Sequence, residues 1–160
     1  AYFSLFILYP LWDSSFNNNF WQPATHTFET KKAIRILGNL QPRESCRDAF
    51  KHLKILTVIG LYILETVTYV HIKTPGIAER GEQFHHYNTR RATDYCLPVH
   101  RLRSTEHKPS YIGAKMWNCL PEMLKKVDQQ QFARHSKTWL LNRPFYSIEE
   151  FMSWQTQPDF

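Results

Sequence analysis

The chain has 160 residues, of which 42% are hydrophobic, 15% aromatic and 21% charged, a composition typical of one globular domain with a real core. It excludes collagen-like, linker-like and wholly disordered chains. The 20 lysines and arginines exceed the 14 acidic residues and give a net charge of +6, which fits a protein that binds polyanions and equally fits an ordinary solvated surface.

The chain opens on an apolar stretch, residues 1–12, which has no initiator Met, no basic leader and a proline at Pro10. These features argue against a signal peptide. The most apolar stretch further along, residues 56–70, is shorter than the roughly 20 residues that a bilayer requires. We expect no membrane contact, and we expect a fragment that begins within a secondary-structure element.

The first helix is predicted to begin near Thr27, a candidate N-cap, and to end at Gly38. Its expected buried face holds Ala33, Ile34 and Leu37. Such a face would bury one side of the helix against the rest of the domain.

A second helix is predicted after Ser45, another candidate N-cap. Cys46, Ala49, Phe50 and Leu53 follow it at helical spacing and define one apolar face. We therefore expect Cys46 to be a core residue, although its place near a helix N-terminus would also suit a nucleophile.

A third helix is predicted from Val58 to about Ile72, with Thr57 as its N-cap. Apolar residues lie almost all round it, which indicates a buried helix. The sequence Thr-Pro-Gly at residues 74–76 ends it.

Residues 77–110 have no clear periodicity, and we expect a long basic loop with one short strand near residues 95–97. Helical signals then return. Pro121 suits the first turn of a short helix, Asp128 suits the N-cap of a helix over 129–141, and Ser147 with Glu150 has capping-box spacing. The predicted fold class is mainly α, with about five or six helices and little or no sheet.

Motifs for catalysis, metals and cofactors are missing from the sequence. The three cysteines are widely spaced and form no C-x2-C pair, which favours a reducing compartment, and His85 and His86 are adjacent rather than at metal-ligand spacing. The aspartates are isolated, and no glycine-rich phosphate loop is present. We expect no catalytic residue, no metal and no cofactor.

Nucleic-acid binding is the function that the side chains favour most. Arginines and an aromatic residue gather in the long loop, where guanidinium groups pair with phosphates and rings stack on bases. They are Tyr87, Arg90, Arg91, Arg101 and Arg103. The alternative is that these arginines tie the loop to its own domain.

Seven runs of sequence stand in a familiar order along residues 2–152. They are KKAIRIL (31–37), SCRDAFKHLKILT (45–57), LYILETVTYV (61–70), HYNTR (86–90), LPVHRLR (97–103), SYIGAKMWNCLP (110–121) and FYSIEEF (145–151). In order and spacing they resemble the C-terminal part of the reverse transcriptase of jockey-like non-LTR retrotransposons. The chain departs from that family at residues 8–15, where Pro10 and Asp13 replace expected glycines, and it has no Cys/His zinc knuckle.

The resemblance implies a place after the catalytic palm of an RNA-directed DNA polymerase. Residues 1–30 would be a remnant of the palm-to-thumb junction, and residues 31–160 the helical thumb and C-terminal domain. The expected role is non-catalytic, with no activity for the isolated chain. The chain would grip an RNA or DNA template–primer inside the cell, in the nucleus or cytoplasm, beside the remainder of the polymerase.

The candidate nucleic-acid contacts combine the family resemblance with the basic middle of the chain, since residues 31–108 carry 14 basic and 7 acidic side chains. They are Lys31, Lys32, Arg35, Tyr87, Arg90, Arg91, Arg101 and Arg103. The alternative function is a structural or protein-interaction helical module with no nucleic-acid role.

Overall fold

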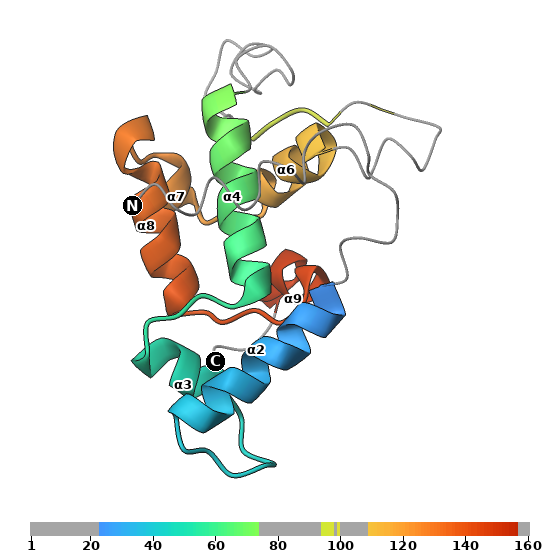
Figure 1. Ribbon diagram of the computed structural model, residues 1–160. Helices are drawn as coiled ribbons and strands as arrows, with labels where there is room; N and C mark the ends of the chain where they lie inside the picture. The colour runs from blue at the N-terminus through green and yellow to red at the C-terminus, as the bar shows by residue number, and fades with distance from the viewer. Residues whose placement is uncertain (1–22, 74–93, 98, 100–108, 157–160) are drawn as a thin grey trace.

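The structure is a computed structural model, and it describes residues 23–73, 94–97, 99 and 109–156 (Figure 1). Within these ranges the chain forms α2 (Pro23–Leu37), α3 (Arg47–His52), α4 (Val58–Lys73), α6 (Pro109–Asn118), α7 (Glu122–Lys125), α8 (Gln129–Leu141), α9 (Ile148–Met152) and the 3-10 turn η3 (Trp154–Thr156). The described ranges contain no strand, so the mainly α fold class is confirmed there.

Helix α4 is the central element, with α6 on one side and α8 on the other (Figure 1). Its residues Ile59, Ile63, Val67 and Val70 recur at helical spacing and are less than 5% exposed. Helix α2 also packs against α4, while α3 packs against α2. The prediction of a buried helix here is confirmed, although Leu61 at 36% exposed marks its solvent side.

The close approach of α6 to α4 depends on Gly113. A Cβ atom on that residue would overlap Cγ2 of Val70 and lie 3.2 Å from Cγ2 of Thr66. Only a residue without a side chain lets the two helices pack at this distance. Helix α6 has no counterpart among the helices expected from the sequence, since an internal glycine is unfavourable for a helix on its own.

The main core is rich in aromatic side chains around Trp117 of α6. The ring of His71 stacks on Trp117 with centroids 4.7 Å apart, and Phe132 of α8 lies 5.1 Å from Trp117. Tyr95 meets the same indole edge-on at 5.7 Å. This cluster joins α4, α6, α8 and the segment at residues 94–97.

A second, smaller core lies between α2 and α3. It contains the buried residues Ile34, Cys46, Ala49 and Phe50, with the partly buried Tyr146 against it. The Cys46 thiol donates to the Lys31 carbonyl with a donor–acceptor distance of 3.8 Å. Cys46 is therefore a core residue, as its position on the apolar face predicts.

Three of the predicted N-caps are confirmed. The Thr57 hydroxyl accepts from Gly60 N at 2.9 Å, the Asp128 carboxylate accepts from Gln130 N, and the Ser147 hydroxyl accepts from Glu150 N. Thr57 also donates to the Phe145 carbonyl at 2.7 Å and so ties the start of α4 to a distant segment. The Glu150 carboxylate accepts from Tyr146 N, one residue before the position that a capping box predicts.

Several predicted boundaries were wrong. Helix α2 begins at Pro23, four residues before the predicted start at Thr27. The N-cap of α3 is Cys46 without a side-chain bond, while the Ser45 hydroxyl accepts from Arg47 N. Pro121 is the N-cap of α7 rather than a residue of its first turn.

The end of α2 differs from the prediction in a more instructive way. The left-handed residue is Asn39, with φ at 48°, and not Gly38. Leu40 N donates to Arg35 O and Asn39 N to Ile36 O, the two bonds of a Schellman motif. At Gly38 an added Cβ would lie 3.1 Å from the Ile34 carbonyl oxygen and 3.3 Å from Leu40 Cγ, so the absence of a side chain relieves a tight fit at the helix end.

The expected strand near residues 95–97 is not formed among the described residues; Tyr95 makes only an isolated bridge, and its backbone is also held by a side chain. Asn118 accepts from Tyr95 N at 2.8 Å and donates to Tyr95 O at 2.9 Å. The end of the predicted loop is also helical, since α6 begins at Pro109. Residues 77–93, 98 and 100–108 of that loop lie outside the described ranges.

Candidate nucleic-acid interface

The positive charge of the described residues is concentrated between α2 and the end of α3. Residues 31–54, which we call the basic lobe, hold 7 basic and 2 acidic side chains. The other described residues hold 7 of each sign. The basic side chains of the lobe are Lys31, Lys32, Arg35, Arg43, Arg47, Lys51 and Lys54.

Two of these cations face the ring of Tyr146. Lys31 Nζ lies 3.7 Å from the ring centroid, and the guanidinium carbon of Arg47 lies 4.5 Å from it. A cation at this distance from an aromatic face is attracted to the ring. Burial raises the pKa of the Tyr146 hydroxyl above its ordinary value, so the phenol stays neutral beside them at physiological pH.

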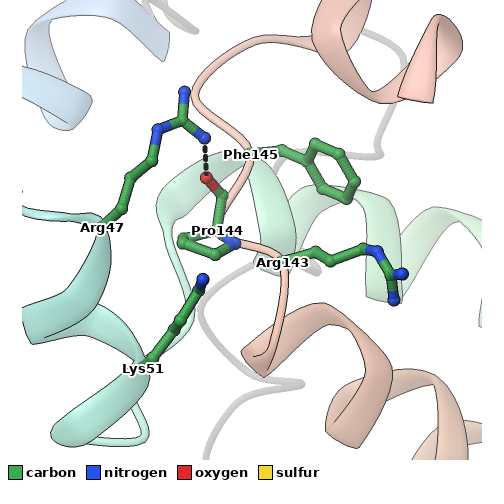
Figure 2. A pocket seen from close by; sticks show the side chains of 5 residues that line it. All are labelled: Arg47, Lys51, Arg143, Pro144 and Phe145. Carbon is green, nitrogen blue, oxygen red and sulfur yellow. Dashed lines mark hydrogen bonds between the residues drawn. The ribbon is translucent and has the colours of Figure 1, made fainter. Parts of the chain in front are cut away.

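Arg47 is also held by two oxygens from a distant part of the chain. Its guanidinium forms an ion pair with Glu150, with Nη2 2.7 Å from Oε1, and donates from Nη1 to the Pro144 carbonyl at 2.9 Å (Figure 2). The planar fork of arginine suits this pair of acceptors. Arg47 therefore anchors α3 to the segment before α9.

Arg35 is partly engaged within the lobe. Its Nη2 lies 3.5 Å from the Glu44 carbonyl, the outer limit of a hydrogen bond, and its side chain is half-buried. Arg35 and Lys31 are both half-buried and therefore less exposed than free phosphate contacts would be.

Three of the four remaining cations of the lobe face solvent, and the fourth, Lys51, is half-buried. Lys32, Arg43 and Lys54 are exposed, and Lys32 Nζ lies 5.5 Å from the ring centroid of Phe28. No carboxylate of the described residues lies within ion-pair distance of these three side chains. They are available to neutralise phosphates.

A shallow hollow beside the lobe is lined by Arg47, Lys51, Arg143, Pro144 and Phe145 (Figure 2). Arg47 and Lys51 approach Pro144 from one side, whereas Arg143 and Phe145 point away from them (Figure 2). The volume of about 10 Å³ holds one water molecule, so the hollow is not a small-molecule site.

The start of the segment at residues 94–97 is fixed to α7 by a buried lysine. Lys125 Nζ lies 2.5 Å from Asp94 Oδ1 and 3.1 Å from the Asn118 carbonyl, and its side chain is 3% exposed. Asn118 also forms two hydrogen bonds with the backbone of Tyr95. Residues 94 and 95 are thus fixed to the end of α6 and to α7.

Among the candidate contacts, Lys31, Lys32 and Arg35 are brought together on α2. Tyr87, Arg90, Arg91, Arg101 and Arg103 lie outside the described residues, so their place relative to α2 stays a prediction. Sequence reasoning missed Arg43, Arg47, Lys51 and Lys54. The signal that would have found them is the run of residues 31–54, in which basic side chains outnumber acidic ones by five.

No protein-family model, curated protein or solved structure matches the chain. Among the described residues, no three His, Cys, Asp or Glu side chains converge in a way that would hold a metal ion. None of the helices in the same residues has the length and apolar character needed to cross a membrane.

Proposed function

We propose that this chain is a non-catalytic C-terminal fragment of an RNA-directed DNA polymerase from a jockey-like non-LTR retrotransposon, and that it grips template–primer nucleic acid. The resemblance of seven sequence runs and the helical fold support this proposal. Its partners would be an RNA or DNA template–primer and the remainder of the polymerase, within the nucleus or cytoplasm.

The observation that carries the proposal is the charge of the basic lobe. Its excess of five positive charges equals the whole excess of the described residues, because the rest of them is balanced. Concentrated positive charge on adjacent helices creates a local potential that attracts a phosphate backbone. Lys32, Arg43 and Lys54 are the contacts that this charge distribution favours.

A salt titration tests the proposal. The full chain is titrated against a labelled RNA–DNA hybrid by fluorescence anisotropy over a range of salt concentrations. Replacing Lys32, Arg43 and Lys54 together by glutamine should lower the slope of log affinity against log salt by up to about 0.9 per lost contact.

The matched control removes the same charge elsewhere. Lys115, Lys126 and Lys137 are also exposed, and they lie on α6, beside α7 and on α8. Replacing these three by glutamine should leave the slope much closer to that of the unchanged chain. A flat salt response in the unchanged chain, or equal slopes for both triple variants, would contradict phosphate contact by the basic lobe.

The second candidate function is a structural or protein-interaction module. The observation that favours it is the internal engagement of Arg47 and Lys31, whose charged groups face Tyr146 rather than solvent. Under this alternative the chain would bind the hybrid no more tightly than a protein of equal net charge. The two triple variants then distinguish the two functions.

A further inference from the structure

Helix α2 carries three large apolar side chains on the side that faces away from the protein. The exposed fraction is 62% for Phe28, 81% for Ile36 and 65% for Leu37, whereas Ile34 alone among the described side chains of the helix is fully buried. We call the exposed residues the outer face of α2: Phe28, Glu29, Lys32, Ala33, Ile36 and Leu37.

This arrangement agrees with the sequence expectation at Ile34 and differs from it at Ala33 and Leu37. Ala33 and Leu37 were predicted to share a buried face with Ile34, but both are exposed. Four of the six outer-face residues are apolar, and the six together form two adjacent i, i+4 rows, 28–32–36 and 29–33–37, in which Lys32 and Glu29 are the charged members. Isolated exposed apolar residues are ordinary, but three large ones gathered on one side of a single helix, Phe28, Ile36 and Leu37, form an apolar patch of the kind that another element or a partner covers.

We propose that residues 2–12 of the same chain cover the outer face of α2. Nine of these eleven residues are hydrophobic, the exceptions being Ser4 and Pro10, and none is charged. An apolar stretch of this length gains free energy when it leaves water, and so does the outer face of α2.

The connection between the two partners has a suitable length. Residues 13–22 link the apolar stretch to Pro23 and include Asp13, two serines and three asparagines, which are residue types that favour turns. Ten residues extend up to about 33 Å, and the distance along α2 from Pro23 to Ile36 is roughly 20 Å. The apolar stretch can therefore fold back along the helix.

The tether also favours this occupant over a separate protein. A segment joined by a short linker has an effective concentration on the order of millimolar at the surface that it reaches. A second copy of the chain or an unrelated partner has to compete with that concentration. Lys32 in the middle of the outer face and Asp13 in the linker add opposite charges on the two sides.

Disulfide trapping in the full chain tests the inference. In a Cys96→Ser background, Leu8→Cys with Ile36→Cys should form an intramolecular disulfide at least about tenfold faster than Leu8→Cys with Lys137→Cys. Lys137 is an exposed residue of α8 and serves as the matched control. Equal rates for the two pairs overturn the inference, and so does a disulfide that joins two chains, because it identifies a second copy as the occupant.

A measurement on the unsubstituted chain guards against variants that fail to fold. With selective methyl labelling, the δ1 methyl of Ile36 should show nuclear Overhauser effects to aromatic protons of Phe3 or Phe6. Their absence while the Trp117 core gives its own methyl–aromatic effects overturns the inference. Neither experiment depends on nucleic acid, so its outcome is independent of the proposed function.

Discussion

The buried ammonium of Lys125 pairs with the carboxylate of Asp94, 31 positions earlier in the chain, with Nζ 2.5 Å from Oδ1. The lysine side chain is 3% exposed and the aspartate 17%. A buried charge is tolerated only when a partner of opposite sign and further hydrogen bonds compensate its lost hydration. Asn118 O, at 3.1 Å from the ammonium, supplies one such bond.

Replacing Lys125 by methionine should lower the free energy of unfolding by about 2 kcal/mol, because Asp94 loses the cation that compensates its burial. The partial exposure of Asp94 keeps the loss below that of a fully buried pair. Urea denaturation followed by circular dichroism measures the change. Lys126→Met, at the exposed neighbouring position, is the control and should change the stability by less than about 0.5 kcal/mol.

Replacing Gly113 by alanine should destabilise the chain by about 2 kcal/mol, since the added methyl group overlaps Val70 Cγ2 across the α4–α6 contact. Thermal and urea denaturation measure the loss. A Val70→Ala substitution alone should also destabilise, but in the Gly113→Ala background it should restore part of the stability. Additive losses from the two substitutions would show that α4 and α6 do not meet at this point.

Replacing Lys54 by glycine should stabilise the chain by about 1 kcal/mol. Lys54 adopts a φ of 52°, a left-handed conformation that costs a residue with a side chain about 1 kcal/mol more than it costs glycine. Lys54→Ala is the control for loss of the charge and should give no gain. Asn39→Gly should give a smaller gain than Lys54→Gly, because asparagine tolerates the left-handed region better.

Local features of the fold could be predicted from the sequence, and packing partners could not. Thr57, Asp128 and Ser147 act as N-caps because a cap depends on residues within one turn. Leu37 lies in a correctly predicted helix but is exposed rather than buried, since spacing defines a face and not what covers it. From the sequence alone, Gly113 argues against a helix; only the contact with α4 shows why a glycine is required there.

The same limit applies to the basic lobe. Its lysines and arginines are visible in the sequence, but the role of each depends on distant residues. Arg47 turns inward because Pro144, 97 positions away, and Glu150 lie beside it. No pattern near residue 47 contains that information, and Lys51 on the same helix remains without such a partner among the described residues.

Arg47 and Lys51 therefore provide the last prediction, which separates anchoring from phosphate contact. Arg47→Lys keeps the charge but cannot reach both Glu150 and the Pro144 carbonyl as the guanidinium does. It should lower the free energy of unfolding by about 1 kcal/mol and leave the salt slope of nucleic-acid binding unchanged.

Lys51→Gln should show the opposite pattern. Its half-exposed side chain makes no ion pair with described residues, so its loss should change the stability by less than about 0.5 kcal/mol. If Lys51 contacts a phosphate, the same variant should lower the salt slope by about 0.9. Urea denaturation and the anisotropy titration measure both quantities for each variant. A lowered salt slope for Arg47→Lys, together with unchanged stability, would show that Arg47 serves nucleic acid rather than the contact between α3 and the segment before α9.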